Sequence, residues 1–149
     1  MRILERESVP YLPHSVDGMP TDGQEVAQKL GADPFSVFKT LVTVGSDLSH
    51  YVFVIPVCST LDLKKAAKAA NVKSLSMLKQ KDLFPLTGYV HGGCSPIGMK
   101  KPFFTVLDET AFLSDKIFFS AGKIGMQVEL EPSVLPEKFG AVVADVALF

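Results

Sequence analysis

A lysine lies inside an otherwise apolar segment of the sequence. The segment Val37–Val44 is rich in β-branched residues, which is typical of a buried strand. Side chains alternate along a strand, so Lys39 shares one face with Val37 and Leu41, while Thr40 lies on the other face. Because a lysine is almost never fully buried without a partner or a use, we expect the Lys39 ammonium to face a cleft. A lysine on an edge strand with its charge in water is the alternative.

Two glycine-containing loops can contact a ligand through their backbones. Residues 92–102 contain three glycines and two prolines, and residues 120–125 carry Lys123 at the tip of a second turn. Free N–H groups in such loops can face a carbonyl oxygen or a phosphate. The second loop lacks the Gly-Lys-Ser/Thr sequence of a P-loop. A tight connection between strands and a polar hairpin turn are the structural alternatives.

Lysines gather in the middle of a chain whose net charge is only −1. Residues 63–81 contain six lysines and no acid, and Lys100, Lys101 and Lys123 add positive charge in the two loops. Such a zone suits a phosphate backbone, and a solvated helix face is the alternative. Aromatic residues do not interleave with these lysines as they would in a platform for single-stranded nucleic acid.

Several kinds of site are not expected. The cysteines and histidines are scattered, at Cys58, Cys94, His14, His50 and His91, and no pair has the spacing of metal ligands. We therefore predict no metal and no cofactor. The acid-containing N-terminus does not resemble a signal peptide, and apolar runs are too short to span a membrane. These features favour a cytoplasmic protein with free thiols and neither a membrane nor DNA as a partner.

The predicted elements alternate between short strands and short helices. Helices are expected over 1–7, 24–30, 63–70, 76–83 and 132–139, with Asp62 capping the third and Pro85 stopping the fourth. Strands are expected over 9–16, 37–44, 50–57, 72–75, 103–107, 116–120, 126–130 and 141–146. Strands outnumber helices and the turns are short. We therefore predict a single α+β domain over residues 1–149, with a curved, mostly antiparallel sheet.

Four segments in this order resemble the YbaK/EbsC family, the free-standing relatives of the editing insertion domain of bacterial prolyl-tRNA synthetase. They are Val37-Phe38-Lys39-Thr40-Leu41, Leu61-Asp62-Leu63-Lys64-Lys65, Gly92-Gly93-Cys94-Ser95-Pro96-Ile97-Gly98-x-Lys100-Lys101 and Ser120-Ala121-Gly122-Lys123-x-Gly125-x-x-Val128-Glu129-Leu130. The resemblance implies a barrel-like mixed sheet with flanking helices. It also implies a trans-acting deacylase that hydrolyses mischarged tRNA, commonly tRNA(Pro) carrying cysteine, alanine or another small amino acid.

The resemblance also implies roles for particular residues. Catalysis falls to Lys39 and to the Gly-x-x-x-Pro loop with Gly92, Gly93, Ser95 and Pro96. The resemblance places Asp22 and Gln127 near the amino-acid pocket. The second glycine turn adds Ser120, Gly122 and Lys123 as substrate-binding residues, and the lysine zone assigns tRNA binding to Lys64, Lys65, Lys100 and Lys101. Since an aminoacyl ester is already activated, loop N–H groups could hold the developing oxyanion. The Lys39 ammonium could fix the terminal ribose or a phosphate or stabilise charge, while water or a substrate thiol attacks.

Two positions depart from the family pattern. Cysteine-specific relatives tend to have an aromatic residue at the position of Asp22 and an acid at that of Gln127. Asp22 could meet the substrate ammonium or cap the helix that begins near Gln24. Cys94 has His91 three residues away, but no third residue orients the pair, so we expect Cys94 to be loop packing.

Two other functions remain open from the sequence. One is a non-catalytic module that binds the acceptor end of tRNA or docks on prolyl-tRNA synthetase. The lysine zone is the observation that suggests it. The other is a hydrolase of small amino-acid esters or thioesters that does not need tRNA.

Overall fold

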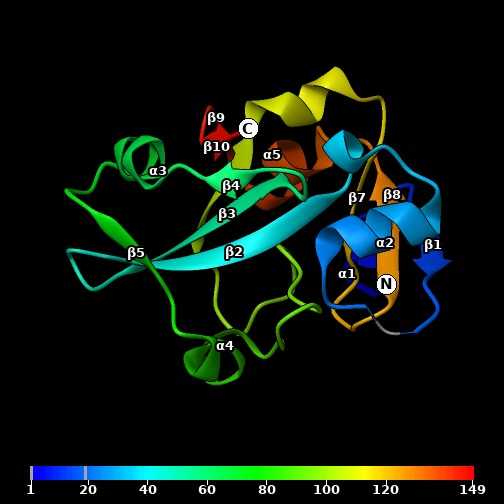
Figure 1. Cartoon of the computed structure of the whole chain (residues 1–149), viewed down its shortest axis with the longest axis horizontal. Helices are drawn as coiled ribbons and strands as arrows, with labels where there is room; N and C mark the ends of the chain where they lie inside the picture. The colour runs from blue at the N-terminus through cyan, green and yellow to red at the C-terminus, as the bar shows by residue number, and fades with distance from the viewer. Residues whose placement is uncertain (1, 19) are drawn as a thin grey trace.

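A five-stranded mixed sheet forms the centre of the protein, which a computed structural model describes over residues 2–18 and 20–149 (Figure 1). Its order is β5-β2-β3-β6-β9. The strands are β2 (Phe38–Gly45), β3 (His50–Pro56), β5 (Leu75–Met77), β6 (Phe104–Asp108) and β9 (Val142–Ala144). Strand β2 pairs antiparallel with β3 and β5, whereas β6 is parallel to both of its neighbours.

Two smaller sheets complete the β structure. The first has the order β1-β8-β7, with β1 (Leu12–Ser15), β7 (Ile117–Ser120) and β8 (Met126–Leu130), and a bridge between Val37 and Phe118 joins it to the start of β2. The second pairs β4 (Thr60–Leu61) with β10 (Ala147–Leu148). The predicted α+β class with a mixed sheet is confirmed, and the barrel-like arrangement is not closed.

Short helices with capped ends connect these strands. They are α1 (Arg2–Arg6), α2 (Gly23–Leu30), α3 (Leu63–Ala70), α4 (Gln80–Thr87) and α5 (Val134–Phe139), with the 3₁₀ helices η1 (Pro34–Ser36) and η2 (Glu109–Leu113). Asp62 accepts from the backbone N–H groups of Lys64 and Lys65, as an N-cap does. Helix α3 ends at Asn71 in the left-handed conformation. Its predicted bounds are therefore confirmed.

The two faces of the central sheet are covered by different helices. Phe53 and Ile55 of β3 pack against the alanines of α3. Val52, the neighbour of Phe53, belongs instead to a cluster with Leu83 on α4. Figure 1 shows α3 and α4 on opposite sides of β2. Consecutive residues of β2 and β3 therefore face different helices.

Several predicted elements differ from the structure. The helix expected over 76–83 is α4, Gln80–Thr87, and it contains Pro85 instead of stopping before it. Pro85 removes one backbone N–H from the helix, yet the last turn is closed by the Thr87 hydroxyl, which donates to the Leu83 carbonyl, and by the Gly88 N–H, which donates to the Phe84 carbonyl.

The other differences concern strands. The strand expected over 9–16 spans only Leu12–Ser15, and the strand expected over 72–75 begins only at Leu75. The strand expected over 141–146 is two strands, β9 and β10, in different sheets. Where β10 begins, the buried Asp108 carboxylate accepts from the Val146 and Ala147 N–H groups at 2.9 Å, so the chain leaves the central sheet at a contact with a side chain.

Candidate active site

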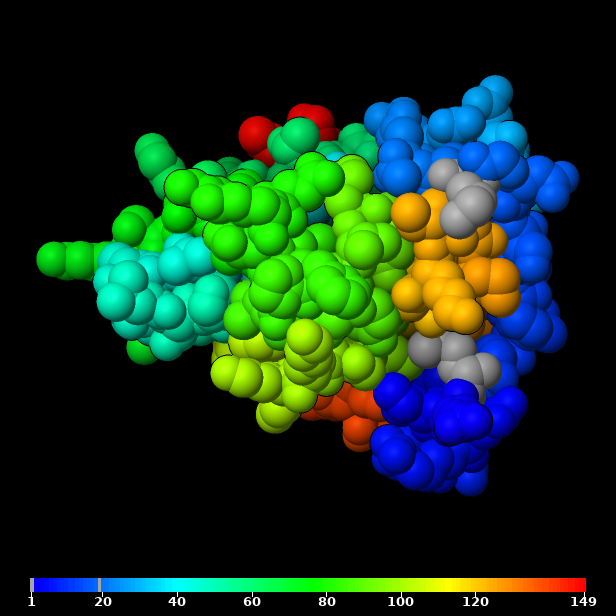
Figure 2. All heavy atoms as spheres, turned by 90° about the horizontal axis from the view of Figure 1, so that it is seen from below, coloured from blue at the N-terminus to red at the C-terminus, as the bar shows by residue number. Residues whose placement is uncertain are grey.

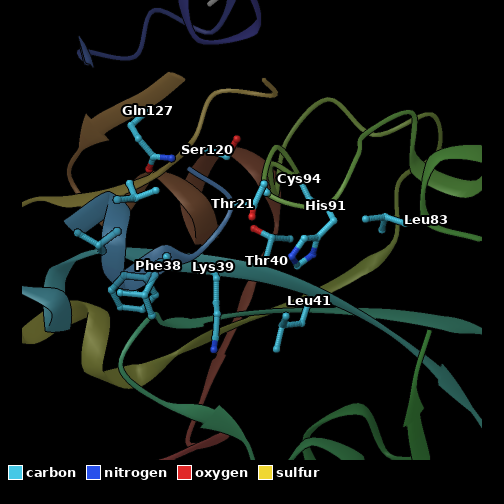
Figure 3. A pocket seen from close by; sticks show the side chains of 15 residues that line it. Thr21, Phe38, Lys39, Thr40, Leu41, Leu83, His91, Cys94, Ser120 and Gln127 are labelled. Carbon is cyan, nitrogen blue, oxygen red and sulfur yellow. The ribbon is translucent and has the colours of Figure 1, made fainter. Parts of the chain in front are cut away.

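The first half of β2 leaves an open edge, because β5 pairs only with Thr43–Gly45. A pocket of about 120 Å³ lies beside this stretch and is lined by residues of β2, α2, α4, the Gly92 loop and the β7–β8 sheet. Four residues assigned to the site from the sequence line it together: Lys39, Gly92, Ser120 and Gln127. Figure 3 shows the side chains of Lys39, Ser120 and Gln127 around this pocket.

Lys39 is half-buried at the pocket but does not turn toward the glycine loops. Its side chain leaves the face of β2 opposite Thr40, and Figure 3 shows Nζ pointing away from Ser120 and Gln127. Burial lowers the pKa of the ammonium, and the nearby charge of Asp22 partly opposes that change. Within the described ranges no hydrogen bond or ion pair engages Nζ, so the ammonium can bind a ligand anion.

Two polar residues, Ser120 and Gln127, form the pocket wall on the side of β2 opposite the Lys39 ammonium; we call them the polar wall. Ser120 and Gln127 are register partners on β7 and β8, and both are buried. The Ser120 Oγ accepts from the Gly122 N–H at 3.1 Å, which leaves its hydroxyl hydrogen free to donate. Thr40 Oγ1 and Gln127 Oε1 are buried and have no hydrogen-bond partner among the described residues. Each such buried acceptor costs about 1–3 kcal/mol of stability.

The two glycine loops contact each other beside the pocket. Gly92 has a φ of +85°, and a Cβ there would lie 2.8 Å from the Thr21 side chain. A Cβ on Gly93 would lie 3.1 Å from the Ile124 backbone nitrogen, next to Lys123. Figure 2 shows the green residues after α4 in contact with the orange residues of the second loop on one face. Both the positive φ and the close contact require glycine at Gly92, whereas at Gly93 a side chain would be tight against the second loop.

Ser95 and Pro96 lie apart from this pocket. Ser95 is buried, and its Oγ accepts from the Ile97 N–H within its own loop at 3.4 Å. Pro96 lines a second, open hollow together with Arg6 and Lys101. Of the described residues assigned to catalysis, Lys39 and Gly92 line the pocket, and Gly93, Ser95 and Pro96 do not.

Asp22 and Gly122 have local structural roles. Asp22 accepts from the Gln24 N–H at 3.1 Å and so caps α2, the simpler of its two predicted roles. It does not line the pocket, although its charge acts on Lys39. Gly122 has a φ of +104°, and its α-carbon faces the Tyr89 ring.

The lysines assigned to tRNA do not form one patch. Lys65 donates to Asp145 at 3.1 Å on the side of the sheet that carries α3, and Lys64 is exposed next to it. Lys100 lies on the side of α4, where Nζ donates to the Pro85 carbonyl at 3.2 Å and sits over the Phe84 ring. A single tRNA surface that includes both pairs is therefore not supported by their placement.

Cys94 lines the pocket without the properties of a nucleophile. Burial raises the pKa of its thiol to about 12, so the reactive thiolate is scarce at neutral pH. Its other surroundings are apolar, which agrees with its predicted packing role. In the part of the chain that the structure describes, no three histidine, cysteine or acidic residues cluster as metal ligands do.

Thr40 and His91 line the pocket and were not among the predicted site residues. The alternation of side chains along β2 could have indicated Thr40, because it lies on the face of the strand opposite Lys39 and helix α3. His91 could have been predicted as a site residue because it directly precedes Gly92 in the sequence.

The chain belongs to the family of aminoacyl-tRNA editing domains, whose model matches residues 21–137. It is 48% identical over 139 residues to EbsC of Enterococcus faecalis, which is named as a Cys-tRNA(Pro)/Cys-tRNA(Cys) deacylase. The match covers 91% of this chain and 84% of that protein. The predicted family and the predicted editing deacylase are thereby confirmed.

Two solved structures are similar over almost their whole length. A protein described as a trans-editing enzyme for prolyl tRNA synthetase superposes with a TM-score of 0.85 at 26% identity, covering 98% of this chain and 92% of that one. The hypothetical protein APE2540 superposes with a TM-score of 0.92 at 24% identity, covering 99% and 97%, and supports the fold. Among the described residues, no helix is long and apolar enough to cross a membrane.

Proposed function

We propose that this protein removes cysteine or another small amino acid from mischarged tRNA, with tRNA(Pro) as the first candidate. The observation that carries the proposal is the small pocket at the open edge of β2, which Lys39, Gly92, Ser120 and Gln127 line together. The identity to EbsC supports the choice of amino acid and tRNA. A synthetase cannot strongly reject a smaller amino acid, so a second site has to remove the error.

The two sides of β2 contact different parts of the substrate during ester hydrolysis. The backbone N–H of Gly92 holds the ester carbonyl as it becomes an oxyanion. The Gly93 N–H does not take part, because it donates to the Val90 carbonyl at 3.0 Å. Lys39, whose Nζ points away from the polar wall, binds the terminal ribose or a phosphate and holds the tRNA end in place. Water, or the substrate's own thiol in the case of cysteine, attacks the carbonyl carbon. The ester bond breaks and the proton passes to the released ribose hydroxyl.

A panel of mischarged tRNAs tests this function directly. Deacylation rates are measured for the wild type and for Lys39→Ala, with the exposed Lys116→Ala as the matched control. Loss of a charge-assisted hydrogen bond predicts a drop of about 10- to 100-fold for Lys39→Ala and none for the control. Equal rates for all three proteins remove Lys39 from the mechanism. If the wild type binds tRNA but hydrolyses none of the panel, the protein is a binding module.

The mischarging synthetase is proposed as the source of the substrate, and prolyl-tRNA synthetase is the first one to test. Editing in trans predicts turnover of purified mischarged tRNA in its absence. A requirement for the synthetase would show as activity only after its addition.

A further inference from the structure

The pocket contains two buried oxygen atoms, one hydroxyl and one amide carbonyl, that have no hydrogen-bond partner among the described residues. Thr40 Oγ1 comes from β2 and Gln127 Oε1 from β8, and both are buried without a partner among the described residues. Gln127 is only 5% exposed. Buried acceptors are normally paired, so a ligand that brings donors would complete this site. Figure 3 shows both side chains on the same side of β2.

The chemistry of an aminoacyl ester limits what can satisfy both atoms. Its carbonyl and ester oxygens only accept hydrogen bonds. A ribose hydroxyl or a substrate thiol offers one hydrogen, whereas the α-ammonium offers three from a single nitrogen. Gln127 Oε1 can only accept, and the Thr40 hydroxyl can accept while it donates its own hydrogen elsewhere. The α-ammonium is therefore the substrate group with enough hydrogens to donate to both side chains that line the pocket.

Charge in the pocket agrees with this assignment. None of the described residues that line it is acidic, so the ammonium would be held by neutral oxygens. A second cation nearby would oppose its binding, and Lys39 is the only charged lining residue within the described ranges. The Lys39 Nζ points away from Thr40 and Gln127, to the other side of the strand. The two positive charges are thus kept apart by β2.

We propose that Thr40 and Gln127 bind the α-ammonium of the aminoacyl group and make the free amine a condition for hydrolysis. The inference rests on the proposed deacylase function and adds a criterion of substrate choice. The enzyme would read the one polar group shared by all amino acids, while pocket size limits the side chain. Esters of α-hydroxy acids and N-acylated aminoacyl-tRNA would be poor substrates.

The test compares the best mischarged tRNA with its α-hydroxy analogue, which has nearly the same size but lacks the ammonium. Single-turnover rates and KM are measured for the wild type, Thr40→Val and Gln127→Met. The exposed Thr60→Val and Gln28→Met serve as matched controls. We expect the wild type to prefer the amino ester by about 100-fold, and each pocket variant to lose about tenfold of that preference. The controls should keep it.

The variant Gln127→Glu provides a second measurement, in which the side-chain oxygen at position 127 is kept. It keeps the shape and adds a charge, so it should lower the KM for the amino ester and leave the KM for the hydroxy ester unchanged. Equal wild-type rates on both esters would overturn the inference and leave the deacylase function intact. Equal losses by the pocket variants on both esters would also overturn it. Hydrolysis of neither ester would instead contradict the proposed function.

Discussion

Lys39 and Thr40 are neighbours in the chain, yet they face different surroundings. Lys39 shares its side of β2 with residues under α3, and Thr40 faces the wall formed by Ser120 and Gln127. One strand can therefore contact two parts of a substrate. The amino-acid end would meet Thr40, and the anionic end of the tRNA would meet Lys39.

Replacing Lys39 by methionine should stabilise the protein at neutral pH. Burial lowers the pKa of Lys39 below the ordinary lysine value of 10.5, so the unfolded chain binds the proton more tightly than the folded chain does. The free energy of unfolding of the wild type should therefore rise between the lowered pKa and 10.5. The gain from Lys39→Met should shrink over the same interval. Urea unfolding at pH 7 and pH 10 measures this, with Lys116→Met as control. A gain that is equal at both pH values would contradict it.

Cys94 should be dispensable for the reaction. With its thiol pKa raised to about 12, Cys94 stays protonated across the neutral range, so the rate should show no dependence on a thiolate between pH 6 and 9. Cys94→Ala should retain deacylation within about threefold, because only packing in the Gly92 loop is lost. A loss of 100-fold or more with an unchanged melting temperature would instead make the thiol part of the chemistry.

Gly92 is constrained both by its backbone conformation and by its contact with Thr21. A comparison with Gly31 separates these two effects. Gly92 and Gly31 both have positive φ, at +85° and +67°, but only Gly92 has atoms where a Cβ would sit. Alanine at either position should cost about 1–2 kcal/mol in strain. Gly92→Ala should in addition push Thr21 away and lower deacylation by tenfold or more, whereas Gly31→Ala should keep full activity. Activity and urea stability of the two variants provide the comparison. Equal activities would show that the contact with Thr21 is unimportant.

Elements with strong local determinants were predicted well from the sequence. Helix α3 has its cap at Asp62 and a left-handed residue at its end, and both bounds are correct. Helix α4 was misplaced because Pro85 was expected to end it. The final strand was misplaced because its break depends on Asp108, a carboxylate 38 residues earlier than its partner Val146. Local patterns do not contain such distant contacts.

The candidate site was predicted in part for the same reason. Lys39, Gly92, Ser120 and Gln127 meet at one pocket, as the resemblance implied. Pro96 lies elsewhere because its loop continues past the pocket to the hollow beside Arg6. The role of Thr40 becomes visible only when the missing partner of its buried oxygen is known.

The arrangement of helices on opposite faces of the central sheet divides the positive charges between two sides. Lys64 on α3 lies across the sheet from α4, whereas the exposed Lys123 adjoins Gly93 next to the pocket. A tRNA end that enters the pocket past the glycine loops and reaches Lys39 would pass close to Lys123, whereas Lys64 on α3 would lie away from that route.

The salt dependence of tRNA binding should distinguish the two sides. Loss of one phosphate contact lowers the slope of log Kd against log salt concentration by about one. We expect that change for Lys123→Gln and none for Lys64→Gln, measured by filter binding from 50 to 200 mM salt. The reverse result would place the tRNA on the α3 side.

Strand β1 pairs with β8 across most of the chain, with His14 opposite Gln127. Hydrogen bonds of this kind form only after a long stretch of intervening polypeptide has been brought to order, and closing such a large loop is entropically slow. Refolding from denaturant should accordingly take milliseconds to seconds, slower than for a helical bundle of similar length. The residue that contacts the amino acid would then be among the last to reach its native neighbours, so recovery of activity would lag behind recovery of helical signal.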